Sequence, residues 1–433
     1  MENDPSRSLS TTGDRDERRF VSDAHTTGMA TVTPSEGDTR DRVVLTATVF
    51  AVLFAQVLLY PGVPALIEAL GARSPVLDAG TWFLATEFVG FVLFAAVWGA
   101  LSDALGRRRP LIALGALGGA AGYALLAVFG GSGRVGFTTV LALRFVQGAF
   151  TIGAFSLALT MLTDLAGGTG RNMGSAGIAI GGGTALGAPI GGRLYALDTL
   201  APLWAASACL LGVSLLVFAV TDRASSTDSE NALDALAALG RTPVLALPYA
   251  FGLIDRLAAG FFAFVGTVYF QTRFGVDAGT TGLLLASFFA PFALLQYPSG
   301  VLSDRYGRVG PIAVGSGLFG FAVIAVGFAP SVLLAGATMA LVGVFGALCA
   351  PATLALVSDL AADGERGTAI GGFNIVGSLG FLGGIVGGGV VTAAAGFDVA
   401  FLVVGFAEVA IALVALPLLL RLDVARIPTF DRG

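Results

Sequence analysis

Long apolar stretches separated by short polar breaks run from residue 43 almost to the end of the chain. A transmembrane helix needs about 20 mostly apolar residues to cross roughly 30 Å of hydrocarbon. Twelve stretches reach that length, so the pattern predicts an all-α membrane protein with twelve transmembrane helices. The predicted spans lie at about residues 43–66, 80–101, 110–130, 136–163, 173–196, 199–221, 243–270, 279–302, 310–329, 331–358, 368–394 and 397–420.

Polar segments divide these spans into two groups of six. Residues 1–42 are polar, and we expect them to form a disordered cytoplasmic tail, while residues 422–433 are expected to form a second cytoplasmic tail. Residues 222–242 form the longest internal polar segment, a linker in which an amphipathic helix is expected over about 230–239. The expected domains are therefore two six-helix bundles, at 43–221 and 243–421.

A motif occurs once in each half, as "GALSDALGRRRP" from Gly99 and as "GVLSDRYGRVGP" from Gly300. Both copies follow the second span of their half, which predicts two homologous, pseudo-symmetric bundles in parallel orientation. The two glycines lack a Cβ and would permit close contact with a neighbouring helix. Asp103 and Asp304 are expected to cap the helix that follows.

Composition and charge narrow the class of protein. The chain is 55% hydrophobic and only 12% charged, with a mean hydropathy of +0.84, whereas soluble domains average about 25% charged residues. A net charge of −5 argues against a nucleic-acid partner. The single histidine, His25, lies in the polar tail, so we expect no metal site, no catalytic triad and no cofactor. The chain contains no lysine, which excludes the lysine-containing nucleotide-binding loop.

The distribution of arginine predicts the orientation. An even number of spans places both termini on one side of the membrane. With the termini in the cytoplasm, thirteen arginines near span ends lie inside and four lie outside, which satisfies the positive-inside rule. Both termini and both copies of the motif are therefore expected on the cytoplasmic side of the cell membrane.

The repeated motif resembles the loop between spans 2 and 3 of the major facilitator superfamily, and the resemblance extends over about residues 43–421. In that family the motif belongs to a cytoplasmic gate that forms and breaks as two halves rock around a central site. The arginines would pair there with acids at the ends of spans 4 and 10, although those acids could equally be solvated helix caps. The resemblance implies the gate residues Gly99, Asp103, Gly106, Arg107, Gly300, Asp304, Gly307, Arg308, Asp164 and Asp359.

Two more stretches resemble elements of this family. The stretch "LRFVQGAF" contains Arg144, Gln147 and Gly148, which share one helix face with Thr151 just beyond it. It resembles the family's Arg-x-x-Gln-Gly element, which is often linked to proton transfer. The stretch "GSAGIAIGGGTALGAPIGG" resembles the antiporter motif of drug-efflux members, whose glycine face packs against the opposite half, although a generic glycine-rich helix stays an alternative. Its matching glycines are Gly174, Gly183, Gly187, Gly191 and Gly192, while Ala188 stands where the motif has proline and Pro189 follows.

Charged residues inside spans are functional candidates because they are costly in a membrane. At about 1.5 Å of rise per residue, Glu87 and Arg144 lie at similar depths and could pair. Protonation of Glu87 would then free Arg144, or the pair could be a static support. Asp255 and Arg256 are about 100° apart on one helix, so one is expected to face a central cavity and the other a neighbouring helix. Glu408 is expected to be structural or to lie at the lipid interface.

These observations predict a secondary active transporter rather than an enzyme. The resemblance favours proton-coupled export of a small lipophilic or cationic molecule by a monomer in the lipid bilayer. Candidates for proton coupling are Asp255, Glu87 and Arg144, and candidates for the substrate cavity are Gln147, Asp255 and Arg256. The alternatives are a proton-coupled symporter that imports a sugar or organic acid, and a transport-dead sensor with the same fold.

Overall fold

The computed structural model describes residues 36–130, 132–133, 135–165, 169–222, 240–362 and 365–424, and every regular element in these ranges is a helix. Eleven segments of this described part are long and apolar enough to cross a membrane. Helix α7 runs beside them, and its many glycines lower its hydropathy. The prediction of an all-α membrane protein built from twelve long helices agrees with this architecture.

The chain order of the elements follows the predicted spans. The first half contains α2 (Glu36–Val57), η1 (Tyr60–Gly62), α3 (Val63–Ala69), α4 (Val76–Leu105), α5 (Arg109–Leu125), η2 (Leu126–Gly130), α6 (Phe137–Thr163), α7 (Thr169–Tyr195), α8 (Ala201–Leu216) and η3 (Val217–Ala219). The second half contains η4 (Pro243–Leu245), α10 (Ala246–Phe261), η5 (Phe262–Gly266), α11 (Thr267–Phe274), α12 (Ala278–Tyr306), α13 (Val309–Gly327), α14 (Val332–Leu360), α15 (Arg366–Ala395) and α16 (Phe397–Val424).

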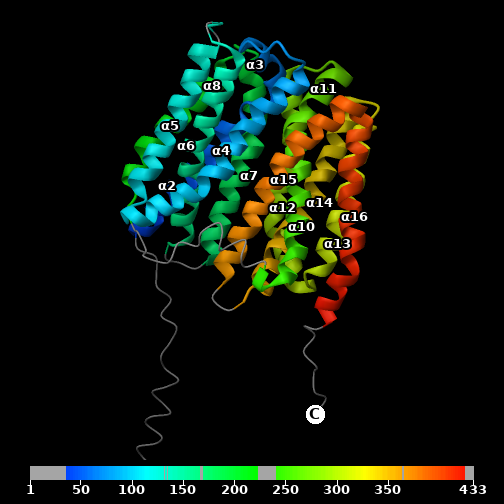
Figure 1. The fold of residues 1–433 in the computed structure, drawn as a ribbon. Coiled ribbons are helices and arrows are strands. Elements are labelled where there is room, and N and C mark those ends of the chain that lie inside the picture. Colours follow the sequence, from blue (N-terminus) through cyan, green and yellow to red (C-terminus); the bar gives the residue numbers. More distant parts are fainter. Residues whose placement is uncertain are drawn as a thin grey trace, which may run out of the picture.

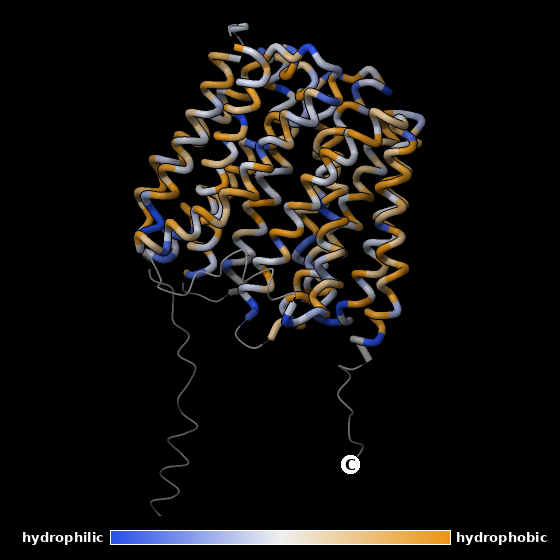
Figure 2. Tube along the Cα trace, in the orientation of Figure 1, coloured by the Kyte–Doolittle hydropathy of each residue, from blue (hydrophilic) through white to orange (hydrophobic). Residues whose placement is uncertain are grey.

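The helices of each half form one bundle, and the two bundles stand side by side (Figure 1). Helix α2 begins and α16 ends at the same end of the molecule, which we call the terminal end; the opposite end is the distal end. Apolar positions cover most of the helix lengths, while polar positions gather toward the two ends (Figure 2). This distribution is what a bilayer requires, because apolar side chains face the hydrocarbon and polar ones face water.

The two halves meet along two helix pairs, α7 with α12 and α4 with α15. At the distal end, the side chain of Gln271 also donates a hydrogen bond of 2.6 Å to the carbonyl oxygen of Pro61. Between α4 and α15, the rings of Phe88 and Phe381 stack with their centroids 4.5 Å apart. The distal end is therefore a point at which the halves are tied to each other.

The polar residues at the start of α2 are helical, whereas the sequence predicts that they belong to a disordered tail. The helix begins at Glu36 rather than near residue 43, and Asp41 and Arg42 are buried in it. Arg42 Nε donates to Asn172 Oδ1 at 3.1 Å, and Thr221 N donates to Asp41 Oδ1 at 3.3 Å. These contacts explain why polar residues are helical here. At the other end of the chain, α16 extends to Val424.

Parts of the expected tails and linker lie outside the described residues. These are residues 1–35 and 425–433 of the tails, and residues 223–239 of the linker with its expected amphipathic helix.

Candidate functional site

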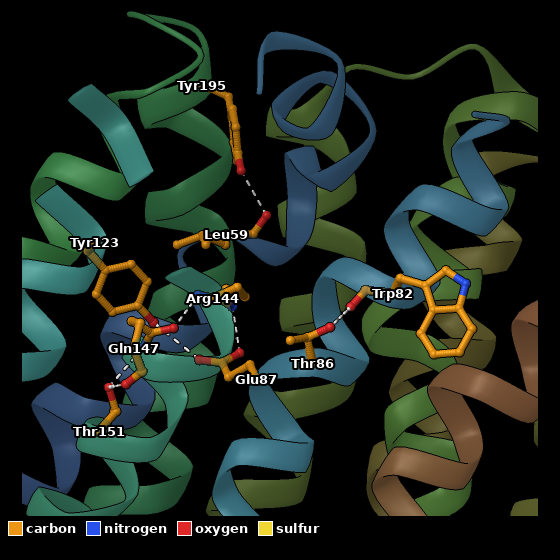
Figure 3. A network of polar contacts seen from close by, with 9 residues as sticks. All are labelled: Leu59, Trp82, Thr86, Glu87, Tyr123, Arg144, Gln147, Thr151 and Tyr195. Carbon is orange, nitrogen blue, oxygen red and sulfur yellow. Dashed lines mark hydrogen bonds and ion pairs between the residues drawn. The ribbon is translucent and has the colours of Figure 1, made fainter. Parts of the chain in front are cut away.

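A buried polar network crosses the first half between α4, α5 and α6 (Figure 3). Arg144 Nη2 donates to Glu87 Oε2 at 2.5 Å, and both side chains are fully buried. Arg144 Nη1 donates to Gln147 Oε1 at 2.8 Å, and Gln147 Nε2 donates to Thr151 Oγ1 at 2.8 Å. The structure thus brings together the residues that the sequence places on one face of α6 and the acid that could pair with them.

Aromatic rings enclose the Arg144 guanidinium. Its Cζ lies 4.8 Å from the ring centroid of Phe83 and 5.5 Å from that of Tyr123, within the range of cation–π attraction. Tyr123 also donates to Glu87 Oε1 at 3.5 Å. No pattern in the sequence indicates that these two rings lie beside Arg144. Because both side chains of the ion pair are fully buried, each charge depends on the other for its stabilisation.

The backbones of α4 and α6 approach each other closely beside the ion pair of Glu87 and Arg144. A Cβ on Gly148 would lie 2.5 Å from the carbonyl oxygen of Glu87. In the second half, a Cβ on Gly343 would lie 2.3 Å from the carbonyl oxygen of Phe288. Phe288 therefore occupies the place of Glu87. Met339, four residues before Gly343 on α14, occupies that of Arg144. At this level the first half carries an ion pair and the second half carries apolar side chains.

The adjacent residues Asp255 and Arg256 on α10 point to different helices. Arg256 Nη2 donates to Asn374 Oδ1 on α15 at 2.8 Å, and its Cζ lies 5.6 Å from the ring centroid of Phe373. The Asp255 carboxyl group instead contacts Cys349 on α14 and Glu408 on α16. Both side chains thus contact neighbouring helices, and Asp255 is turned toward the interior of its own bundle.

Glu408 is fully buried, so an expected position at the lipid interface is wrong. Its Oε2 accepts a hydrogen bond of 3.1 Å from Ser316 Oγ on α13. A Cβ on Gly320 would lie 2.9 Å from the Glu408 Cβ, so the glycine makes room for the acid. Hydropathy alone could not identify this position, because it does not specify which way a helix is rotated.

In the first copy of the motif, the arginine that binds Asp164 is Arg108, not Arg107. Gly106 ends α4 with φ at +59°, a left-handed conformation that glycine adopts readily. This turn leaves Arg107 exposed and places Arg108 directly before α5. Asp164 therefore pairs with Arg108 instead of with the expected Arg107.

A different acid caps α5 than the one expected. Asp222 Oδ1 accepts hydrogen bonds from the backbone N–H groups of Arg108 at 3.0 Å and Arg109 at 3.1 Å. Asp103 is exposed at the end of α4 and does not cap α5. Sequence reasoning missed Asp222 because it follows α8, far from the motif along the chain.

In the second copy, Arg308 is the central residue. It pairs with Asp304, and its Nε donates to Asp359 Oδ2 at 3.2 Å and its Nη1 to Ser303 Oγ at 3.1 Å. Partial burial alone would lower the pKa of Arg308, but the hydrogen bonds and charges of the two carboxylates raise it. Asp304 thus binds Arg308 rather than capping α13, whose first turn has no side-chain cap. Gly307, with φ at +89°, forms the turn.

The expected close contacts at the first motif glycines are not observed. A Cβ on Gly99 would meet nothing within 4 Å in the described part of the chain, and one on Gly300 would meet Pro351 Cβ at 3.9 Å. The ion pairs of Arg108 and Arg308 each lie within one half. Both turns are thus bound to their own bundle.

The glycines of α7 pack mainly against their own half, which corrects the expectation of an interface with the opposite half. Added Cβ atoms on Gly183 and Gly187 would lie 2.7 and 3.1 Å from the carbonyl oxygens of Phe50 and Phe54 on α2, and one on Gly191 would lie 2.1 Å from that of Leu58, directly after α2. Of the five predicted glycines, Gly192 approaches the opposite half, where its Cβ would lie 2.4 Å from Ala278 O. Gly174 has open space around it among the described residues.

Removal of the observed cap tests its role. We expect Asp222→Ala to destabilise the protein by about 1 kcal/mol, because two backbone donors of α5 lose their acceptor. Asp222→Asn retains an acceptor oxygen and should stay near the wild type. Thermal unfolding of the purified protein in detergent measures both variants. Equal loss in both would indicate that the charge, rather than the cap, stabilises the turn.

Comparisons with known proteins agree with this architecture. The family described as "Major Facilitator Superfamily" matches residues 45–272 and 249–431. The class E tetracycline resistance protein of Escherichia coli is 28% identical over 303 residues, 66% of this chain and 73% of that protein. The class G protein of Vibrio anguillarum is 28% identical over 355 residues, 75% and 85% of the two chains. A solved D-xylose-proton symporter superposes with a TM-score of 0.69 at 15% identity, over 86% of this chain and 96% of that one.

Proposed function

The chain belongs to the Major Facilitator Superfamily, and from that premise we propose that it exports a small lipophilic or cationic molecule in exchange for protons. The buried pair of Glu87 and Arg144 carries the proposal. A proton on Glu87 neutralises one partner and releases Arg144 to its remaining contacts, Gln147 and the aromatic rings. The pair therefore has two states that differ by one proton, as an antiporter requires. The similarity to tetracycline resistance proteins supports export and a drug-like substrate.

The arrangement of the halves supports transport by alternating access. We propose that the terminal end, with both motif turns, the start of α2 and the end of α16, faces the cytoplasm. The halves are tied at the distal end by the bond from Gln271 to Pro61, while Arg108 and Arg308 bind acids of their own half. This arrangement corresponds to a gate that is open at the cytoplasmic end. Arg256 and Gln147 stay candidates for substrate contact.

Proton flux in proteoliposomes tests the function. A pH gradient is imposed, and tetracycline, lipophilic cations, sugars and organic acids are added in turn. We expect a drug-like compound to dissipate the gradient while it moves against the protons. Glu87→Gln should lower the substrate-dependent proton flux to background, because the amide cannot take up the proton. Glu68→Gln, at an exposed position on α3, is the matched control and should behave as the wild type.

The alternatives predict other outcomes of the same experiment. Movement of substrate and protons in the same direction would establish a symporter. This alternative is retained because a D-xylose-proton symporter has the same fold. Binding of a compound without any flux would indicate a sensor. Normal coupling in Glu87→Gln would refute the role of the pair while leaving transport intact.

A further inference from the structure

A second group of ionisable side chains lies in the other half, away from Glu87 and Arg144, with Glu408 fully buried and Asp255 partly buried. Asp255 on α10 and Glu408 on α16 have carboxyl groups in mutual contact, and Cys349 on α14 lies beside them. Ser316 on α13 donates to Glu408 Oε2. Four helices of one bundle therefore meet at two acids, at a level where a membrane helix usually carries apolar side chains.

The hydrogen bonding around these acids is incomplete. Asp255 Oδ1 and Glu408 Oε1 are both buried, and neither has a donor among the residues that the structure describes. A buried carboxyl oxygen without a partner is costly. An acid proton on one carboxyl group would supply the donor that both groups lack.

The charges around the two carboxyl groups also favour a bound proton. Two carboxylates in contact, with buried oxygen atoms on both, cannot both be ionised without strong repulsion. Arg256 is the nearest cation on the same helix, but its guanidinium binds Asn374 on α15. The thiol of Cys349 faces the pair from α14 and carries no positive charge. In the first half, by contrast, the buried Glu87 is neutralised by an arginine.

We propose that Asp255 and Glu408 share one proton and form a proton-binding site in the second half. With the proton bound, one carboxyl group donates to the other and the pair carries a single negative charge. Loss of the proton leaves two negative charges in contact and destabilises the packing of α10 against α14 and α16. This inference does not depend on the proposed substrate or on the direction of transport, because it concerns the chemistry within one bundle.

Unfolding as a function of pH tests the shared proton in the full-length protein in detergent. The folded protein holds a proton that the unfolded chain releases, so its stability should fall as pH rises above the range in which free carboxyl groups titrate. Over the range in which the pair titrates, the unfolding equilibrium constant should rise by up to about tenfold per pH unit. Asp255→Asn and Glu408→Gln should lose this dependence, because an amide N–H donates permanently to the remaining carboxylate. Glu68→Gln, at an exposed acid, should keep the wild-type profile.

Infrared spectroscopy gives an independent readout that also serves if the variants do not fold. The wild type should show the C=O stretch of a protonated carboxylic acid at neutral pH, and this band should disappear as pH rises. It should be absent from the two amide variants. A wild type without such a titrating band, or amide variants with the wild-type pH profile, would overturn the proposal. Because neither measurement uses a substrate, failure of the transport experiment would leave this result unaffected.

Discussion

Arg144→Ala is expected to destabilise the protein by about 3–5 kcal/mol, the usual cost of leaving one partner of a buried ion pair without the other. The Glu87 carboxylate would stay fully buried between α4 and α6, where the Tyr123 hydroxyl donates to it over a long 3.5 Å and no positive charge remains beside it. Unfolding by titration with a denaturing detergent measures the loss. A change below about 1 kcal/mol would mean that water reaches the site, since exposed pairs contribute that little.

The second half supplies a matched control for this experiment. Because Phe288 and Met339 occupy the equivalent places there, the double variant Glu87→Phe/Arg144→Met copies a packing that the fold already contains. Replacing a buried ion pair by apolar residues of similar volume is often neutral or stabilising. We therefore expect the double variant to regain most of the stability that Arg144→Ala loses, while substrate-dependent proton flux stays absent. Recovery of flux would show that the pair does not couple protons.

Gly191→Ala is expected to disrupt the contact between α7 and Leu58, the residue that follows α2. The new Cβ would lie 2.1 Å from the carbonyl oxygen of Leu58, and a backbone atom cannot turn aside as a flexible side chain can. Overpacking of this kind usually costs about 1–3 kcal/mol, and we expect a value in the upper part of that range. The drop in the midpoint of thermal unfolding in detergent measures it.

Gly174→Ala on the same helix is the control, because its Cβ meets nothing within 4 Å among the described residues. Both glycines belong to the stretch that resembles the antiporter motif, so a pattern-based interpretation treats them alike. The structure separates them. Equal destabilisation by the two substitutions would show that the α7–α2 contact is not what the motif provides.

The sequence predicts the membrane helices well because their length and apolar content follow from the thickness of the bilayer. It also predicts that Glu87 and Arg144 can meet, since depth along a helix is obtained by counting residues. The rotation of each helix about its axis cannot be obtained in this way. Most faces of these helices are apolar, so hydropathy does not reveal that Asp255 and Glu408 face each other.

The polar contacts at the terminal end were the hardest to anticipate. The choice of Arg108 over Arg107 depends on a single left-handed residue, Gly106, that shifts the turn by one position. Asp222 caps α5 from beyond α8, a partner that no local pattern near the motif indicates. The sequence motifs also do not reveal the asymmetry of the two halves, because both halves carry the same motif. Phe288 nevertheless occupies in the second half the place that Glu87 has in the first.

The position of Asp222 links the end of the first half to the first copy of the motif. Asp222 caps the first turn of α5, and it is the last residue that the structure describes before the connection to the second half. One side chain therefore joins the point at which the chain leaves the first bundle to the turn that carries the motif. A change that displaces either of them acts on the other through the two hydrogen bonds that Asp222 accepts.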